Sequence, residues 1–143
     1  MLAVQADGCR IETIEGLAAS GAIASLQQAF RMENALQCGF CTSGMLLTAH
    51  ELLEREPHPD PVTVREALGG NYCRCTGYHA IVQAVMRAAA RRGGSAAPEA
   101  ASANGDYIGR SVVRPQTARL VAGRGTYTDD VVVPRLLHAA FVR

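Results

Sequence analysis

The sequence predicts a mainly α-helical protein organised around a small four-helix bundle of two helix–loop–helix halves. The chain of 143 residues is rich in alanine, has no tryptophan and contains only 5% aromatic residues, a composition that favours helices over a β-sandwich. Apolar side chains recur at helical spacing through residues 17–92. Proline and glycine clusters divide this region into separate helices.

Residues 1–16 are expected to form a short extended segment. β-Branched and other apolar residues lie on both sides of Asp7-Gly8, a pair that is typical of a tight turn. An isolated hairpin is only marginally stable in water, so we expect this segment to be the end of a longer structure.

The first two helices of the bundle are expected at about 21–35 and 43–55. In the first, Ile23, Leu26 and Phe30 fall on one face. The second carries a comparable apolar stripe, and Pro57 comes directly after it. Both helices therefore have one face suited to a shared core.

The third and fourth helices are expected at about 61–68 and 78–92. Asp60 is a suitable N-cap for the third helix, and Pro61 fits its first helical position. Two glycines follow that helix and favour its end. Arginines in the last turns of the fourth helix complement the negative end of its dipole.

Beyond the bundle the composition changes twice. Residues 93–105 are small, polar and unpatterned, as in a flexible linker. Residues 106–143 are richer in glycine, valine, threonine and tyrosine, and the apolar runs at 131–133 and 136–142 predict two strands or a strand and a turn. The last run is still apolar where the sequence stops, so we expect a truncated, partly extended tail.

Charge and hydropathy narrow the range of functions. The formal net charge is +1, which argues against nucleic-acid binding driven by bulk charge. No stretch approaches the roughly 18–20 apolar residues that cross a bilayer, and the N-terminus lacks the pattern of a signal peptide. We therefore expect a cytoplasmic protein with no membrane span. Disulfides are rare in that compartment, so we expect four of the five cysteines to be metal ligands and Cys9 to be a spare thiol.

Four cysteines form two compact motifs. Cys38 and Cys41 have C-x2-C spacing, Cys73 and Cys75 have C-x-C spacing, and 31 residues separate the two pairs. Each motif comes just before a predicted helix, where free backbone N–H groups and the helix dipole stabilise negative charge and lower thiol pKa values. The motifs thus predict a four-thiolate metal site.

Ligand type alone leaves the metal open. Four thiolates suit both a [2Fe–2S] cluster and a structural zinc ion. Zinc ribbons favour C-x2-C at both knuckles, and a C-x-C pair is cramped for the usual knuckle turn, so the spacing favours iron. Two disulfides are a third alternative, which the absence of an export signal disfavours.

The segments QCGFCTSGM at 37–45 and NYCRCTGYHAIVQAV at 71–85 resemble the second iron–sulfur domain of the xanthine dehydrogenase, aldehyde oxidase and carbon monoxide dehydrogenase family, the molybdenum hydroxylases. The resemblance covers residues 1–92 and implies a four-helix domain that holds one [2Fe–2S] cluster for electron transfer. It implies ligation by all four motif cysteines (Cys38, Cys41, Cys73 and Cys75). It also implies that Gln37 and Cys75 approach the molybdopterin, with the electron path running through Cys75.

The resemblance also bears on the two ends of the chain. Residues 1–16 resemble the end of a plant-type ferredoxin domain, whose own cluster ligands are not in this sequence. Residues 106–143 resemble the start of the molybdopterin-binding large subunit. The expected partners are therefore that large subunit, an FAD-binding medium subunit and a separate ferredoxin domain. We expect no catalysis by this chain alone. The alternatives are a zinc-stabilised helical interaction module and a non-functional gene fragment.

Overall fold

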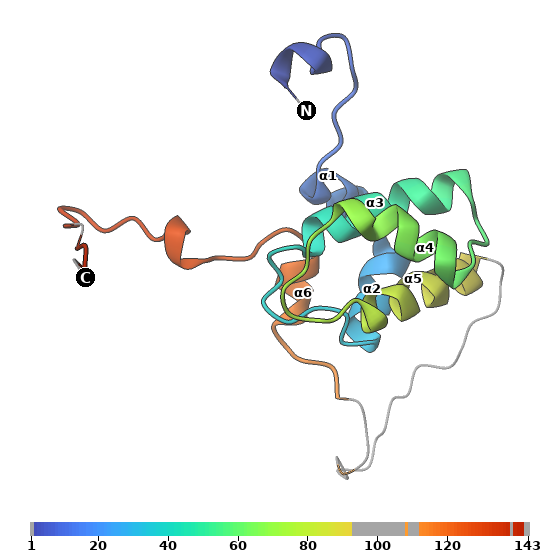
Figure 1. The fold of residues 1–143 in the computed structure, drawn as a ribbon. Helices are drawn as coiled ribbons and strands as arrows, with labels where there is room; N and C mark the ends of the chain where they lie inside the picture. Colours follow the sequence, from blue (N-terminus) through green and yellow to red (C-terminus); the bar gives the residue numbers. More distant parts are fainter. Residues whose placement is uncertain (1, 93–107, 109–111, 138, 142–143) are drawn as a thin grey trace.

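The computed structural model describes residues 2–92, 108, 112–137 and 139–141. Every regular element in these ranges is helical, which confirms the predicted mainly α class (Figure 1). The α-helices are α1 (Ile14–Ser20), α2 (Ala24–Met32), α3 (Thr42–Arg55), α4 (Pro61–Ala67), α5 (His79–Arg92) and α6 (Thr117–Val121). The 3-10 helices are η1 (Ala3–Ala6), η2 (Leu68–Gly70) and η3 (Thr128–Asp130).

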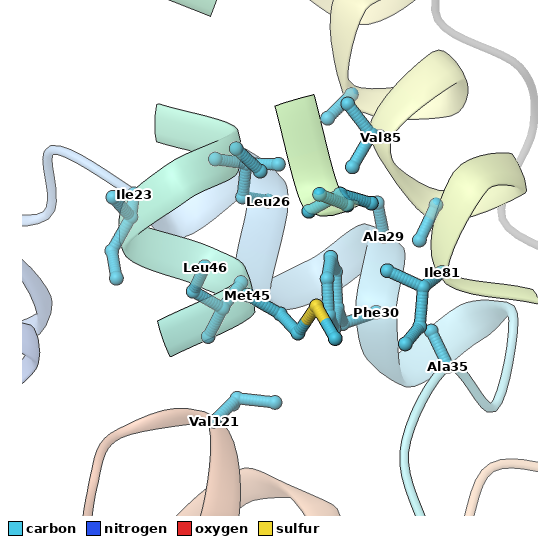
Figure 2. Close-up of a cluster of buried hydrophobic side chains, with 14 of the residues drawn as sticks. Ile23, Leu26, Ala29, Phe30, Ala35, Met45, Leu46, Ile81, Val85 and Val121 are labelled. Carbon is cyan, nitrogen blue, oxygen red and sulfur yellow. The ribbon is translucent and has the colours of Figure 1, made fainter. Parts of the chain in front are cut away.

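The core lies between α2, α3 and α5. Figure 2 shows Phe30 of α2, Met45 of α3 and Ile81 of α5 directed into one apolar cluster, and all three are completely buried. Burying a side chain of this size contributes about 1.5–3 kcal/mol. The apolar positions at helical spacing in the sequence are therefore the ones that form the core.

Local sequence explains where the helices begin and end. The Thr13 hydroxyl accepts a hydrogen bond from the Gly16 amide, 3.4 Å away, at the start of α1. Gly21, with a φ of 78°, ends that helix in the left-handed region that glycine adopts readily. Asp60 caps α4 as predicted, because its Oδ1 accepts the amides of Val62 at 2.9 Å and Thr63 at 2.7 Å.

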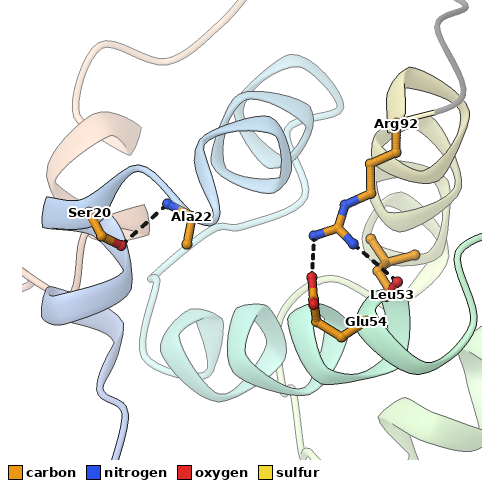
Figure 3. Close-up of polar contacts among 5 residues, drawn as sticks. All are labelled: Ser20, Ala22, Leu53, Glu54 and Arg92. Atoms are coloured by element: carbon orange, nitrogen blue, oxygen red, sulfur yellow. Dashed lines mark hydrogen bonds and ion pairs between the residues drawn. The ribbon is translucent and has the colours of Figure 1, made fainter.

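The end of α5 is tied to α3. Arg92 donates to the Leu53 carbonyl oxygen at 3.0 Å and pairs with Glu54 at 3.0 Å (Figure 3). From the sequence we expect the arginines in the last turns of this helix to interact with the negative end of its own dipole. In the structure Arg92 also neutralises a carboxylate near the end of α3, which fixes the two longest helices to each other.

Several local expectations are wrong. The helix expected at 21–35 is shorter, because Asn34 has a φ of 50°, and it is preceded by a separate helix, α1, that starts inside the expected extended segment. Residues 3–6 form a 3-10 helix rather than an extended segment. The described part of the tail contains no strand: its apolar run turns at 134–135 and stays exposed. A strand is stabilised by a neighbouring backbone, and none is paired with this run.

The segment after the predicted linker packs against the bundle. The linker itself, 93–105, lies outside the described residues. α6 lies against α2 and α3 (Figure 1), and its Leu120 and Val121 belong to the buried core. Gln27 of α2 donates a hydrogen bond to the Val121 carbonyl at 3.0 Å. Among the residues that the structure describes, no helix is long and apolar enough to cross a membrane.

Candidate metal centre

Two loops carry the four motif cysteines to one site. The first cysteine loop, residues 36–41, connects α2 to α3, and the second cysteine loop, residues 71–78, connects η2 to α5. The Gln37 side chain donates a hydrogen bond to the Cys75 carbonyl at 2.9 Å, so the loops touch although 38 positions separate these residues. The two motifs therefore lie next to each other, as a shared site requires.

The sulfur atoms pair across the motifs rather than within them. The Sγ atoms of Cys38 and Cys75 are 3.7 Å apart. The thiols of Cys41 and Cys73 lie close enough to influence each other's pKa. Two thiolates that share a tetrahedral metal at about 2.3 Å each lie about 3.8 Å apart, so the separation of the Cys38 and Cys75 sulfurs suits one metal position.

The two pairs differ in exposure. Cys73 is buried with 8% of its surface accessible and Cys41 is half-buried, whereas Cys38 and Cys75 are exposed. The site therefore has an inner pair and an outer pair. Within the described ranges, no three His, Cys, Asp or Glu side chains converge on a point that would hold a single metal ion.

Burial raises the pKa of the Cys41 thiol to about 12, and the adjacent thiols of Cys73 and Cys38 act in the same direction. This is opposite to the expected effect of a helix N-terminus, although Cys41 is the N-cap of α3. Desolvation and the neighbouring sulfurs outweigh the backbone amides. A metal must therefore displace a proton from Cys41 when it binds.

Cys73 behaves in the opposite way. Burial acts to raise its thiol pKa, but hydrogen bonds from the Thr76 side chain and from the amides of Cys75 and Thr76 prevail and lower it. The Thr76 hydroxyl lies 3.1 Å from the Cys73 sulfur. The inner pair thus combines a thiol whose pKa is lowered, Cys73, with one whose pKa is raised, Cys41.

Tyr78 shapes the second cysteine loop from within. Its hydroxyl accepts a hydrogen bond from the Cys73 amide at 2.8 Å and donates one to the Asn71 carbonyl at 3.3 Å. Gly77 and Tyr78 both have positive φ values, 65° and 67°. Asn71 also donates to the Thr48 hydroxyl of α3 at 2.7 Å. Sequence reasoning did not assign a role to Tyr78, and its place directly after Thr-Gly was the available clue.

Residues from the tail reach the first cysteine loop. The Tyr127 hydroxyl donates a hydrogen bond to the Cys38 carbonyl at 3.2 Å. Burial raises the pKa of Tyr127 and the nearby Cys38 raises it further, so this donor stays protonated. Arg114 donates to the carbonyls of Leu36 and Gln37. No motif in the sequence connects residues 114–127 with the cysteines.

Comparison with known proteins identifies this arrangement. The family described as "[2Fe-2S] binding domain" matches residues 13–86 and so contains all four motif cysteines. The chain belongs to this family. Its [2Fe–2S] binding domain is of the type found in the small iron–sulfur subunits of molybdenum hydroxylases and has an electron-transfer role.

Two curated relatives illustrate the similarity. The chain is 56% identical over 87 residues to the nicotine 6-hydroxylase small subunit of Paenarthrobacter nicotinovorans, covering 61% of this chain and 52% of the relative. It is 43% identical over 88 residues to the xanthine dehydrogenase iron-sulfur-binding subunit of Escherichia coli O157:H7, covering 59% and 55%. The chain thus spans about half the length of the curated relatives it matches.

Two solved structures have the same fold. Aldehyde oxidoreductase from Desulfovibrio gigas matches with a TM-score of 0.74 and 35% identity, over 82% of this chain and 14% of that one. Quinoline 2-oxidoreductase from Pseudomonas putida 86 matches with a TM-score of 0.58 and 52% identity, over 65% and 60% of the two chains. These matches support the helical arrangement seen here.

The residues of this [2Fe–2S] binding domain fit the cluster that the family implies. The donor set consists of four free thiols in two pairs, and thiolates are the usual ligands of such clusters. The amides of Cys75 and Thr76 lower the pKa of the Cys73 thiol, and backbone amides near a ligand sulfur also tune iron–sulfur centres.

Proposed function

We propose that Cys38, Cys41, Cys73 and Cys75 are the four ligands of one [2Fe–2S] cluster. The observation that carries this assignment is the meeting of the two motifs, with the Cys38 and Cys75 sulfurs 3.7 Å apart and the Cys41 and Cys73 thiols near enough to influence each other's pKa. When bound, the cluster supplies one-electron transfer. The chain's own part is to fix the four sulfurs, to shield the inner pair from water and to leave the outer pair near the surface.

We further propose that the edge formed by Gln37 and Cys75 faces a molybdopterin cofactor on a partner. Both residues are exposed, and the hydrogen bond between the Gln37 amide and the Cys75 carbonyl holds them together. Two aromatic rings are exposed at the cysteine motifs: Phe40 lies within the first motif, and Tyr72 directly precedes the second. Exposed aromatic residues are frequent in protein interfaces, so this edge is suited to contact with another domain.

The proposed parent assembly is a molybdenum hydroxylase. Relatives named as subunits include caffeine dehydrogenase subunit gamma and 6-hydroxypseudooxynicotine dehydrogenase complex subunit beta, so similar chains are parts of multi-subunit dehydrogenases. We propose a molybdopterin-binding large subunit, an FAD-binding medium subunit and a ferredoxin domain as partners. We also propose that residues 106–143 are the start of a large subunit; the D. gigas match covers 82% of this chain and so extends beyond residues 13–86. A cytoplasmic location is proposed because free thiols persist there.

Anaerobic reconstitution with iron and sulfide tests the ligand assignment. We expect the purified chain to acquire [2Fe–2S] stoichiometry, a visible absorption that dithionite bleaches, and a rhombic paramagnetic resonance signal on reduction. Cys73→Ser should abolish or strongly alter this signal, because the substitution removes an inner ligand. Cys9→Ser is the matched control, since Cys9 is exposed and its thiol contacts only the Gln5 carbonyl among the described contacts.

Two results would contradict the assignment. A colourless wild-type chain that binds one zinc ion and no iron would favour the zinc-stabilised interaction module. Equal loss of the cluster in Cys9→Ser and Cys73→Ser would show that the signal depends on thiol content rather than on the four proposed ligands.

A further inference from the structure

The segment that follows the predicted linker holds the first cysteine loop at three places, beginning with Arg114. Its Nη1 donates hydrogen bonds to the carbonyl oxygens of Leu36 at 3.1 Å and Gln37 at 3.2 Å. Hydrogen bonds from a charged donor are stronger than neutral ones. Arg114 thus fixes the two peptide groups that lead into Cys38.

Leu120 makes the second contact, at the middle of the loop. Gly39 has a φ of 84°, and a Cβ atom placed on it would lie 3.0 Å from both Cδ atoms of Leu120. Leu120 is only 7% exposed. The loop backbone between Cys38 and Cys41 is therefore packed closely against a side chain of α6, and only glycine leaves room for this approach.

Tyr127 makes the third contact. Its hydroxyl donates to the Cys38 carbonyl at 3.2 Å, and its ring meets Phe40 edge to face, with centroids 5.3 Å apart and planes at 79°. Edge-to-face aromatic pairs are stabilising beyond the apolar area that they bury. Tyr127 therefore contacts both neighbours of Gly39: its hydroxyl contacts Cys38 and its ring contacts Phe40.

The second cysteine loop has no such dependence on the tail among the described contacts. It is held by its own Tyr78, through the Cys73 amide and the Asn71 carbonyl, and by Asn71 on Thr48 of α3. All of these residues lie within the matched domain, 13–86. The second cysteine loop is thus held by residues of the domain itself, whereas the first cysteine loop is also held by residues that lie outside the domain.

We propose that Arg114, Leu120 and Tyr127 form a C-terminal clamp that positions the first cysteine loop for cluster binding. They are positioning residues, because they act on Cys38 and Cys41 through the loop backbone. Only the effect of the clamp on cluster binding depends on the proposed function. The ordering of residues 36–41 is a property of the chain itself.

Hydrogen–deuterium exchange on the full, metal-free chain tests the clamp directly. The net contribution of one neutral hydrogen bond corresponds to about a fivefold change in a local opening equilibrium. Tyr127→Phe removes only the hydroxyl and should therefore speed exchange in residues 36–41 about fivefold. Arg114→Ala should have a larger effect, about tenfold or more, because two hydrogen bonds from a charged donor are lost. Arg114→Lys should restore part of the protection.

The chain provides its own controls. Residues 71–78 should exchange at the wild-type rate in each clamp variant. Ser20→Ala removes a hydroxyl that donates to the Leu17 carbonyl at 3.1 Å in α1, away from both cysteine loops, and it should leave residues 36–41 unchanged. In the reconstituted chain, iron release to a chelator should accelerate in the same order, with Arg114→Ala ahead of Tyr127→Phe and Ser20→Ala at the wild-type rate.

The outcomes separate the clamp from the proposed function. If the wild-type chain forms no [2Fe–2S] cluster, the ligand assignment fails while the exchange measurement still decides the clamp. Unchanged exchange at 36–41 in both Arg114→Ala and Tyr127→Phe would overturn the clamp. Equal acceleration in both cysteine loops would also overturn it, because the residues would then contribute only to general stability.

Discussion

Replacing Gly44 with alanine tests how the second cysteine loop is fixed to α3. Gly44 lies in the first turn of α3, and a Cβ atom placed there would approach the Asn71 Oδ1 to 2.7 Å, closer than side chains tolerate. The Asn71 side chain cannot move away freely, because its Nδ2 donates to the Thr48 hydroxyl at 2.7 Å. The substitution should therefore break this hydrogen bond.

Two effects of similar size oppose each other in this variant. Alanine in place of a helical glycine stabilises by about 0.5–1 kcal/mol. Loss of the Asn71–Thr48 hydrogen bond costs about 0.5–1.5 kcal/mol. We therefore expect Gly44→Ala to change the free energy of unfolding by less than about 1 kcal/mol in the wild-type background. In an Asn71→Ala background only the gain remains, so the same substitution should stabilise by about 0.5–1 kcal/mol.

Urea unfolding of the metal-free chain under reducing conditions measures all four corners of this cycle. The expected coupling between the two positions is about 1 kcal/mol. Gly44→Ala should also speed amide exchange in residues 71–78 and leave residues 36–41 unchanged. Equal stabilisation by Gly44→Ala in both backgrounds would refute the reasoning, because Asn71 could not then be lodged against α3.

Three further predictions concern stability. Phe30→Ala removes a fully buried ring and should cost about 3–5 kcal/mol, measured by urea unfolding; a cost below about 1 kcal/mol would contradict the assigned core. The folded-state pKa of Cys41 is raised from 9.0 to about 12, so the stability that its neutral thiol contributes is complete below pH 9.0 and is lost as the pH rises towards about 12. Thermal melts of Cys41→Ser should therefore show a smaller loss of stability at alkaline pH than the wild type. An identical pH profile in the two proteins would contradict this. Hydrogen bonds from Thr63 and Val62 lower the pKa of Asp60 from its ordinary value of 3.8. The ionised carboxylate therefore stabilises the fold above pH 3.8, and this stabilisation is lost as the pH falls through the lowered pKa of the folded state. The stability of Asp60→Asn should depend less on acid pH than that of the wild type, and an unchanged acid profile would refute this.

The helices were largely predictable because their determinants are local. Asp60 with Pro61 starts α4 as expected, and the predicted and observed ranges of α3 differ by one residue. The errors fell where the chain has weaker local preferences. α1 follows a threonine cap that the sequence analysis did not use, and Asn34 ends α2 early by adopting a positive φ. The strands expected in the tail did not form in its described residues, since a strand requires a partner that periodicity alone does not supply.

The site was predictable in composition but not in arrangement. The spacing of the cysteines predicted four thiol ligands, and the resemblance linked Gln37 with Cys75. Neither showed that the sulfurs pair across the loops, nor that Cys41 is harder to ionise rather than easier. The contribution of Tyr127 was invisible, because 89 positions separate it from Cys38.

The sequence by itself determined the helical class and the donor chemistry of this protein, because helical periodicity, caps and ligand types are written in neighbouring residues. Only the tertiary structure decided which thiols stand together, which of them is buried, and which distant side chains hold the first cysteine loop. Those properties depend on distances and desolvation between segments far apart in the chain, and no local pattern encodes them.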